Sequence, residues 1–203
     1  WFNERYAGIP SKPSNLVIPE FEWSVHVPAQ RLEYTPGVPV ELAIDPGKKC
    51  YCVAFIQRVG TDRVHVLDCI YKRNWIAQTV IPEVMRHPLF AYVKNGPAPH
   101  GAIDVAGFAE PGTIGQAEIW LKMAGIHLVG QRYPEDVTIG TLRHILAAKM
   151  IYFNNLGNES LNGEAIEPLA EFRLWRWRDE VASMHEAAKP IDRNNHFTKA
   201  IMY

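Results

Sequence analysis

The chain has 203 residues, 47% of them hydrophobic, which is enough to bury one core and to form one domain with an arm. Its formal net charge of −1 excludes a strongly basic protein, so any contact with nucleic acid would need a local basic patch. Three cysteines without a CxxC pair argue against a disulfide scaffold or a zinc site, and no apolar run approaches the ~20 residues that span a bilayer.

Residues 1–39 are rich in proline and show little periodicity. Because each proline restricts the preceding residue to extended geometry, this segment is predicted to be an extended arm or linker over the surface of a core domain. It includes one predicted short strand, Phe21–Val27. The first residue is Trp1 rather than methionine, so we expect the chain to be a fragment of a longer protein.

From Val40 the pattern changes to β-rich runs separated by turns, and residues 40–203 are predicted to form the core domain. Two tight turns join three predicted strands into an antiparallel meander: Val40–Asp45, Cys50–Val59 and Arg63–Tyr71. A helix is then predicted from a cap at Asn74 to about Val93, with a kink or early break at Pro82.

The second half alternates strands and helices. We predict a strand over His100–Val105, a helix over Gly115–Met123 closed by Gly125, a strand over Ile126–Val129 and a helix over Asp136–Met150. A late strand or short helix follows at Leu169–Trp177, and Asn194 or Asn195 caps a final helix, His196–Tyr203. The predicted fold class is therefore α/β, a mixed sheet with helices on both faces.

Two acids carry the main chemical signal, because each stands at the carboxyl end of a buried strand and a glycine follows it. These are Asp45, in Ala43-Ile44-Asp45-Pro46-Gly47, and Asp104, in Ala102-Ile103-Asp104-Val105-Ala106-Gly107. Buried carboxylates repel one another unless they are paired or bind a metal, and Mg²⁺ or Mn²⁺ prefers such oxygen ligands. Glycine after Asp45 is expected to leave room for a substrate backbone. The alternative is structural, since Asp45-Pro46-Gly47 is also a good turn.

A third element is the polar run from Ile191 into the last predicted helix. His196, Lys199, Ala200 and Tyr203 share one helical face. The run, which includes Arg193, enters the helix at its positive end and is suited to complete a metal site or to contact a phosphate.

Other candidates are basic or aromatic. Lys48 and Lys49 are expected either to guide a phosphate backbone or simply to be exposed in a turn. A basic patch is expected from Arg143, Arg173, Arg176 and Arg178. Trp175 and Trp177 alternate with arginines in a way that suits stacking on single strands, but burial in the core is the favoured interpretation.

Residues 40–203 resemble the nuclease domain of the large terminase subunit of tailed bacteriophages, within the RNase H-like superfamily. The segments that carry the resemblance are those of Asp45 and Asp104, the Gly115–Trp120 helix before Gly125, and Asn194-Asn195-His196 through Tyr203. It implies an RNase H-like fold, two Mg²⁺ or Mn²⁺ ions, Asp45 as a bridging ligand and Asp104 as a second. The third ligand maps to the Asn195-His196 region, and His196 is counted as catalytic.

The chain departs from this pattern at Lys199, where many relatives have an acid. Lys199 is expected either to contact the scissile phosphate, to replace a metal with a fixed charge, or to be a solvated helix residue. Asp192 is an alternative carboxylate ligand from the preceding loop.

The resemblance also implies partners. Residues 1–39 would follow an ATPase motor that this chain lacks, since no Walker A sequence is present. Double-stranded DNA, the small terminase subunit and the portal are the expected partners, with no membrane, in the host cytoplasm. Arg143, Arg193, Lys199 and the two turn lysines are the expected DNA contacts.

The leading hypothesis is an endonuclease that cuts concatemeric viral DNA during genome packaging by two-metal-ion phosphodiester hydrolysis. A Holliday-junction resolvase-like nuclease shares the acids but should require a dimer. A third hypothesis is a catalytically silent RNase H-like module that binds partner proteins or DNA, which Lys199 in an acidic position favours.

Overall fold

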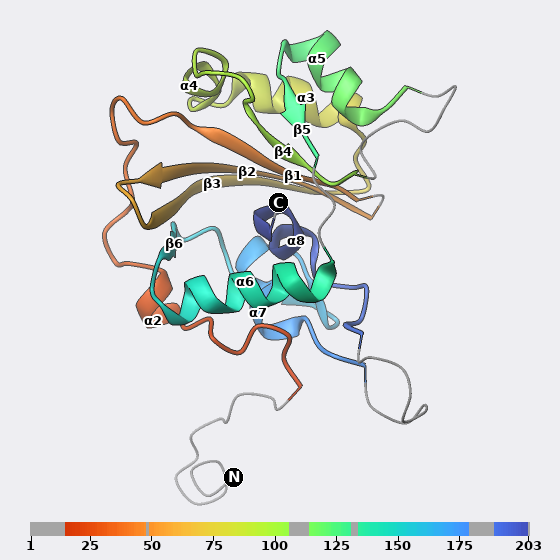
Figure 1. Cartoon of the computed structure of the whole chain (residues 1–203). Coiled ribbons are helices and arrows are strands. Elements are labelled where there is room, and N and C mark those ends of the chain that lie inside the picture. Colours follow the sequence, from red (N-terminus) through yellow and green to blue (C-terminus); the bar gives the residue numbers. More distant parts are fainter. Residues whose placement is uncertain (1–14, 48, 106–113, 131–133, 179–188, 203) are drawn as a thin grey trace, which may run out of the picture.

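A six-stranded mixed sheet runs through the centre of the protein, and helices cover both of its faces (Figure 1). The strands lie in the order β5-β4-β1-β2-β3-β6. This computed structural model describes residues 15–47, 49–105, 114–130, 134–178 and 189–202. The expected α/β class is confirmed.

The antiparallel meander is also confirmed. Its strands are β1 (Glu41–Pro46), β2 (Cys50–Val59) and β3 (Arg63–Arg73). In the register of β1 and β2, Asp45 lies opposite Cys52, so the strand carries Asp45 to the edge where the chain turns back. A register shift at Phe55/Ile56 interrupts the pairing of β2 with β3.

Three short strands extend the sheet in parallel. They are β4 (Gly101–Ile103) beside β1, β5 (Leu128–Val129) beside β4, and β6 (Ile151–Phe153) beside β3. Gly101 has φ +155°, and a Cβ there would lie 2.0 Å from the carbonyl oxygen of Leu42. Only glycine therefore lets β4 approach β1 this closely, and the approach brings Asp104 beside the end of β1.

The upper layer in Figure 1 consists of α3 (Ala77–Arg86), α4 (Phe90–Lys94) and α5 (Gln116–Ala124). The single helix predicted over 74–93 is wrong: Pro82 lies inside α3, and the chain leaves the helix at His87 (ψ 136°), the residue that Pro88 forces to be extended. Asn74 is not the cap, because it has φ 58° directly after β3. Gly125 closes α5 in the left-handed conformation, as predicted.

The lower layer holds α2 (Trp23–His26), α6 (Glu135–Ala147), α7 (Glu171–Leu174) and α8 (His196–Met202). A 3₁₀ turn, η2 (Pro168–Ala170), leads into α7, and a two-stranded hairpin, β7 (Ser160–Leu161) with β8 (Glu164–Ala165), precedes it. None of the described helices is long and apolar enough to cross a membrane.

The strand predicted at Phe21–Val27 is wrong, because α2 forms there. His26 stabilises this turn: its Nδ1 accepts a hydrogen bond from the Glu22 backbone N–H (2.9 Å), and its Nε2 donates to the Leu146 carbonyl (3.0 Å). Val17 and Ile18 are buried in the lower core. The domain boundary at residue 39 stays a prediction.

Alternation along β1 divides its side chains between two cores. Leu42 and Ile44 pack in the upper core under α3 and α5, whereas Ala43 packs in the lower core with Phe197 and Ala200 of α8. Because side chains two residues apart share a face of a strand, Asp45 lies on the same face as Ala43. The carboxylate at the end of β1 therefore faces α8.

Candidate metal and nucleic-acid site

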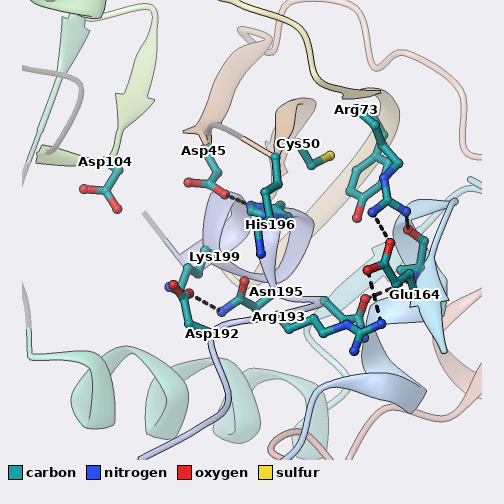
Figure 2. Close-up of a pocket in the computed structure, with 15 residues that line it drawn as sticks. Asp45, Cys50, Arg73, Asp104, Glu164, Asp192, Arg193, Asn195, His196 and Lys199 are labelled. Atoms are coloured by element: carbon teal, nitrogen blue, oxygen red, sulfur yellow. Dashed lines mark hydrogen bonds and ion pairs between the residues drawn. The ribbon is translucent and has the colours of Figure 1, made fainter.

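A pocket of about 470 Å³ opens at the carboxyl ends of β1 and β4. The start of α8, the loop before it, the β7–β8 hairpin and the end of β3 complete its walls. Asp104 follows β4, and its backbone N–H donates to the carbonyl of Ile44 on β1 (3.2 Å). The structure thus brings Asp45 and Asp104 into one pocket, as their places in the sequence predicted (Figure 2).

Asp45 is only 6% exposed and has a fixed partner. His196 Nδ1 donates to Asp45 Oδ2 over 2.8 Å. Burial raises the pKa of Asp45, the bond from His196 opposes that rise, and the charge of Asp104 adds to it. For His196, burial alone would lower the pKa, but the carboxylates of Asp45 and Glu171 raise it above its ordinary value. The two groups therefore stabilise each other in the charged form.

Gly47 makes room for this pair. A Cβ at this position would lie 2.6 Å from His196 Nδ1 and 2.6 Å from the Cys50 carbonyl oxygen. The sequence suggested that this glycine leaves space for a substrate backbone, but the space is filled by the imidazole of His196. Gly47 is therefore required by the position of the histidine.

Glu171, which the sequence analysis missed, holds the start of α8. It is fully buried, and its Oε1 accepts hydrogen bonds from Tyr71 Oη (2.8 Å) and the His196 backbone N–H (2.8 Å). Its Oε2 accepts from the backbone N–H and the hydroxyl of Thr198 (2.9 and 3.1 Å). A carboxylate at a helix N-terminus satisfies N–H groups that have no partner within the helix. Glu171 thereby sets where His196 enters the pocket.

Lys199 lies one turn after His196 and is held by two acids. Its Nζ is 2.9 Å from Asp192 Oδ1 and 3.8 Å from Glu135 Oε1 on α6. Asn195 Nδ2 also donates to Asp192 Oδ1 (3.1 Å). The hydrogen bond from Lys199 lowers the pKa of Asp192. Asp192 thus contacts Lys199 and Asn195, and its predicted role as a metal ligand stays a prediction.

The opposite wall of the pocket carries Arg73, Arg193 and Glu164 (Figure 2). Glu164 on β8 pairs with Arg73 at the end of β3 and with Arg193 (3.1 Å), and the bond from Arg73 lowers the pKa of Glu164. The sequence analysis named Arg193 alone. The Asn162-Gly163 pair, both residues with positive φ, is a signal that would have placed Glu164 on a hairpin.

The predicted DNA contacts divide into two groups. Lys49, Arg193 and Lys199 line the pocket, while Lys48 lies outside the described residues. Arg143 does not line this pocket and is 2.6 Å from Glu20.

Side chains from the predicted basic and aromatic run have structural partners. Arg173 donates to Asn158 and Ser160, and Arg176 donates to Asn15. Trp175 is buried and donates to the Ile191 carbonyl (3.0 Å), which confirms its interpretation as a core residue.

The donor chemistry of the pocket fits a hard divalent cation. Asp45 and Asp104 supply carboxylate oxygens from adjacent strand ends, and the charge of Asp104 adds to the rise in the Asp45 pKa that burial causes. Asn195 is 1% exposed, and its Oδ1 has no hydrogen-bond partner among the residues that the structure describes. Mg²⁺ typically uses one or two carboxylates and completes its shell with water and substrate phosphate. In the part of the chain that the structure describes, no three His, Cys, Asp or Glu residues form a metal-binding group.

No family model and no curated protein sequence matches this chain, but solved structures do. The large terminase of a thermophilic bacteriophage, in complex with ATP-gamma-S, matches 100% of the chain at a TM-score of 0.69 and 16% identity. The chain spans about half of that protein, 48%. The P22 large terminase nuclease domain matches at 0.66 and 15% identity, over 95% of this chain and 91% of that one.

The large terminase nuclease of the thermophilic phage G20c, with bound magnesium, matches at a TM-score of 0.57 and 14% identity, over 95% of each chain. The chain therefore has the fold of phage large-terminase nuclease domains, and the predicted RNase H-like architecture is confirmed.

Proposed function

We propose that this chain is the nuclease portion of a phage large terminase, a divalent-metal-dependent endonuclease that cuts concatemeric double-stranded viral DNA during genome packaging. The observation that carries the proposal is the pairing of Asp45 and Asp104 at adjacent strand ends in one pocket, with His196 fixed against Asp45. The fold likeness to terminase nucleases, one of them with bound magnesium, supports it.

Asp45 and Asp104 would hold the Mg²⁺ or Mn²⁺ ion. When bound, such an ion polarises the phosphodiester and lowers the pKa of a coordinated water. His196 orients the Asp45 carboxylate through Nδ1, so only its Nε2 remains for a substrate or an ion. Glu171 keeps α8 and hence His196 in place.

The far wall would contact the DNA backbone. Arg73, Arg193 and Lys49 place positive charge across the pocket from the acids, although the whole chain carries a formal charge of −1. Glu164 pairs with both arginines, so a phosphate would compete with a carboxylate there. Binding should then weaken with salt, as phosphate contacts do.

The length of the matched terminase suggests which other protein parts would work with this chain. The chain corresponds to about half of a large terminase that binds an ATP analogue, which supports an ATPase motor as the other part of the protein. The small terminase subunit, the portal and a location in the host cytoplasm belong to the same proposal.

Plasmid cleavage with Mn²⁺ or Mg²⁺ tests the function. Changing a residue that only supports a metal ligand typically costs 10–100-fold, so replacing the ligand in Asp45→Asn should reduce cleavage by more than about 100-fold. The matched control is Asp62→Asn, in the exposed turn at the other end of β2 and β3, which should cut like the parent. Equal cleavage by Asp45→Asn and the parent would refute the proposal.

One observation favours a different function. Lys199 places a positive charge beside the acids, as expected of a catalytically silent module that binds DNA or partner proteins in an assembly. Such a module would bind duplex DNA through Arg73 and Arg193, yet neither the parent nor Asp45→Asn would cut it. A resolvase-like nuclease would instead cut branched DNA in preference to linear duplex.

A further inference from the structure

Asp45 shares its pocket with a second acid and with an ammonium group. Asp45 at the end of β1, Asp104 after β4 and Lys199 on α8 all line this pocket. In Figure 2, Lys199 lies below Asp45, and Asp104 lies to the left of Asp45.

The ammonium group of Lys199 is fixed in this position. Asp192 holds it from the loop before α8 at 2.9 Å, and Glu135 lies 3.8 Å from it at the start of α6. Only 23% of the Lys199 side chain is exposed, unlike the 61% of Lys122 on α5. Because two acids from different elements contact it, Lys199 is a permanent positive charge of the site.

Among the residues that the structure describes, the ligands beside this charge are too few for a pair of ions. Two-ion sites place their ions about 3.5–4 Å apart and need several carboxylates to neutralise them. The described residues contain no group of three metal-binding side chains, and Asp192 is engaged by Lys199 and Asn195. Asp45, Asp104 and Asp192 with Lys199 carry a net charge of −2, which one divalent ion already balances.

We propose that this site takes one divalent cation and that the Lys199 ammonium stands in place of a second. The inference rests on the proposed function, and it replaces the two ions that the sequence analysis expected. Lys199 would balance part of the charge of a bound phosphate, as a fixed cation that needs no metal ligands.

The number of bound ions is measurable without DNA or catalysis. Mn²⁺ is titrated into the full chain, and free Mn²⁺ is counted by its electron paramagnetic resonance signal. The variants are Lys199→Asp, which leaves a carboxylate beside Asp192 and Glu135, and Asp45→Asn. The matched control is Lys122→Asp, because Lys122 also pairs with a glutamate (Glu118, 2.6 Å) but lies outside the pocket.

We expect one ion for the parent and for Lys122→Asp, two for Lys199→Asp, and a loss of at least 10-fold in affinity for Asp45→Asn. Two ions in the parent would overturn the inference while leaving the nuclease proposal intact, and this result does not depend on the folding of any variant. One ion in a Lys199→Asp variant with the parent's circular dichroism would also overturn it. No Asp45-dependent ion in the parent would overturn both proposals.

Discussion

Glu171 offers a direct test of how the pocket is held, through the isosteric change Glu171→Gln. The carboxylate accepts four hydrogen bonds, and the donors come from β3 and α8. In Gln, the NH₂ group must take the place of one oxygen. At the Oε1 position it meets the His196 N–H, and at the Oε2 position it meets the Thr198 N–H. Either orientation leaves one backbone donor of α8 without an acceptor.

The size of the effect follows from that one lost bond. A buried donor without an acceptor costs about 1–3 kcal/mol, so we expect Glu171→Gln to lower the free energy of unfolding by roughly 2 kcal/mol. For a domain of this size, 1 kcal/mol corresponds to about 2–4 °C in Tm, which gives a decrease of about 4–8 °C. Glu171→Ala removes the acceptor of all four bonds and leaves a cavity, and should cost about 4 kcal/mol or more.

Thermal unfolding at neutral pH measures this difference, and the exposed Glu159→Gln is the control, with an expected change within about 2 °C. Burial raises the pKa of Glu171. Because that pKa is raised, the folded chain binds the proton more tightly than the unfolded chain does, so the stability of the parent relative to Glu171→Gln should increase as the pH falls through the raised pKa. Equal Tm values at neutral pH would refute the role of Glu171 as an ionised cap.

Two further changes test packing and charge. Gly47→Ala would put a Cβ 2.6 Å from the fixed carbonyl of Cys50, so we expect a loss of about 1–3 kcal/mol in thermal unfolding. The control Gly140→Ala meets open space within α6 and should gain about 0.5–1 kcal/mol; similar Tm values for the two would contradict this. Burial alone would raise the pKa of Asp68, but the hydrogen bond from His87 and that from its neighbour's backbone lower it below 3.8. Because a third of the side chain is exposed, Asp68→Asn should lower the free energy of unfolding by less than about 1 kcal/mol at pH 7. This loss should disappear as the pH falls below 3.8, because Asp68 of the parent then becomes protonated. A loss that grows in acid would contradict this prediction.

The elements that the sequence predicted well are those whose signal is local. Alternation and turn residues determine the meander, and the strand that carries Asp45 can be recognised without knowing what covers it. Gly125 likewise ends α5 by its own conformation. Where a partner distant in sequence decides the structure, the prediction failed: α2 forms because His26 bonds to Leu146, 120 residues away.

The same difference between local signals and distant partners separates the site residues that were predicted from those that were missed. Asp45 and Asp104 were predicted from strand ends, and His196 from its place at the start of a helix and from the resemblance. Glu171 was missed because its partner Tyr71 lies 100 residues away, and nothing local distinguishes it from a surface glutamate. Arg73 was missed for a similar reason, since it lies 91 residues from Glu164.

Net charge was uninformative because acidic and basic side chains offset one another within one pocket. Asp45 and Asp104 lie at the sheet, whereas Arg73 and Arg193 lie across from them. A formal sum of −1 is the total of both sets and conceals each of them. A nucleic-acid backbone along the basic wall would have its phosphates drawn towards the arginines and repelled by the acids unless a cation neutralises the acids. Binding of the cation and binding of DNA should therefore favour each other.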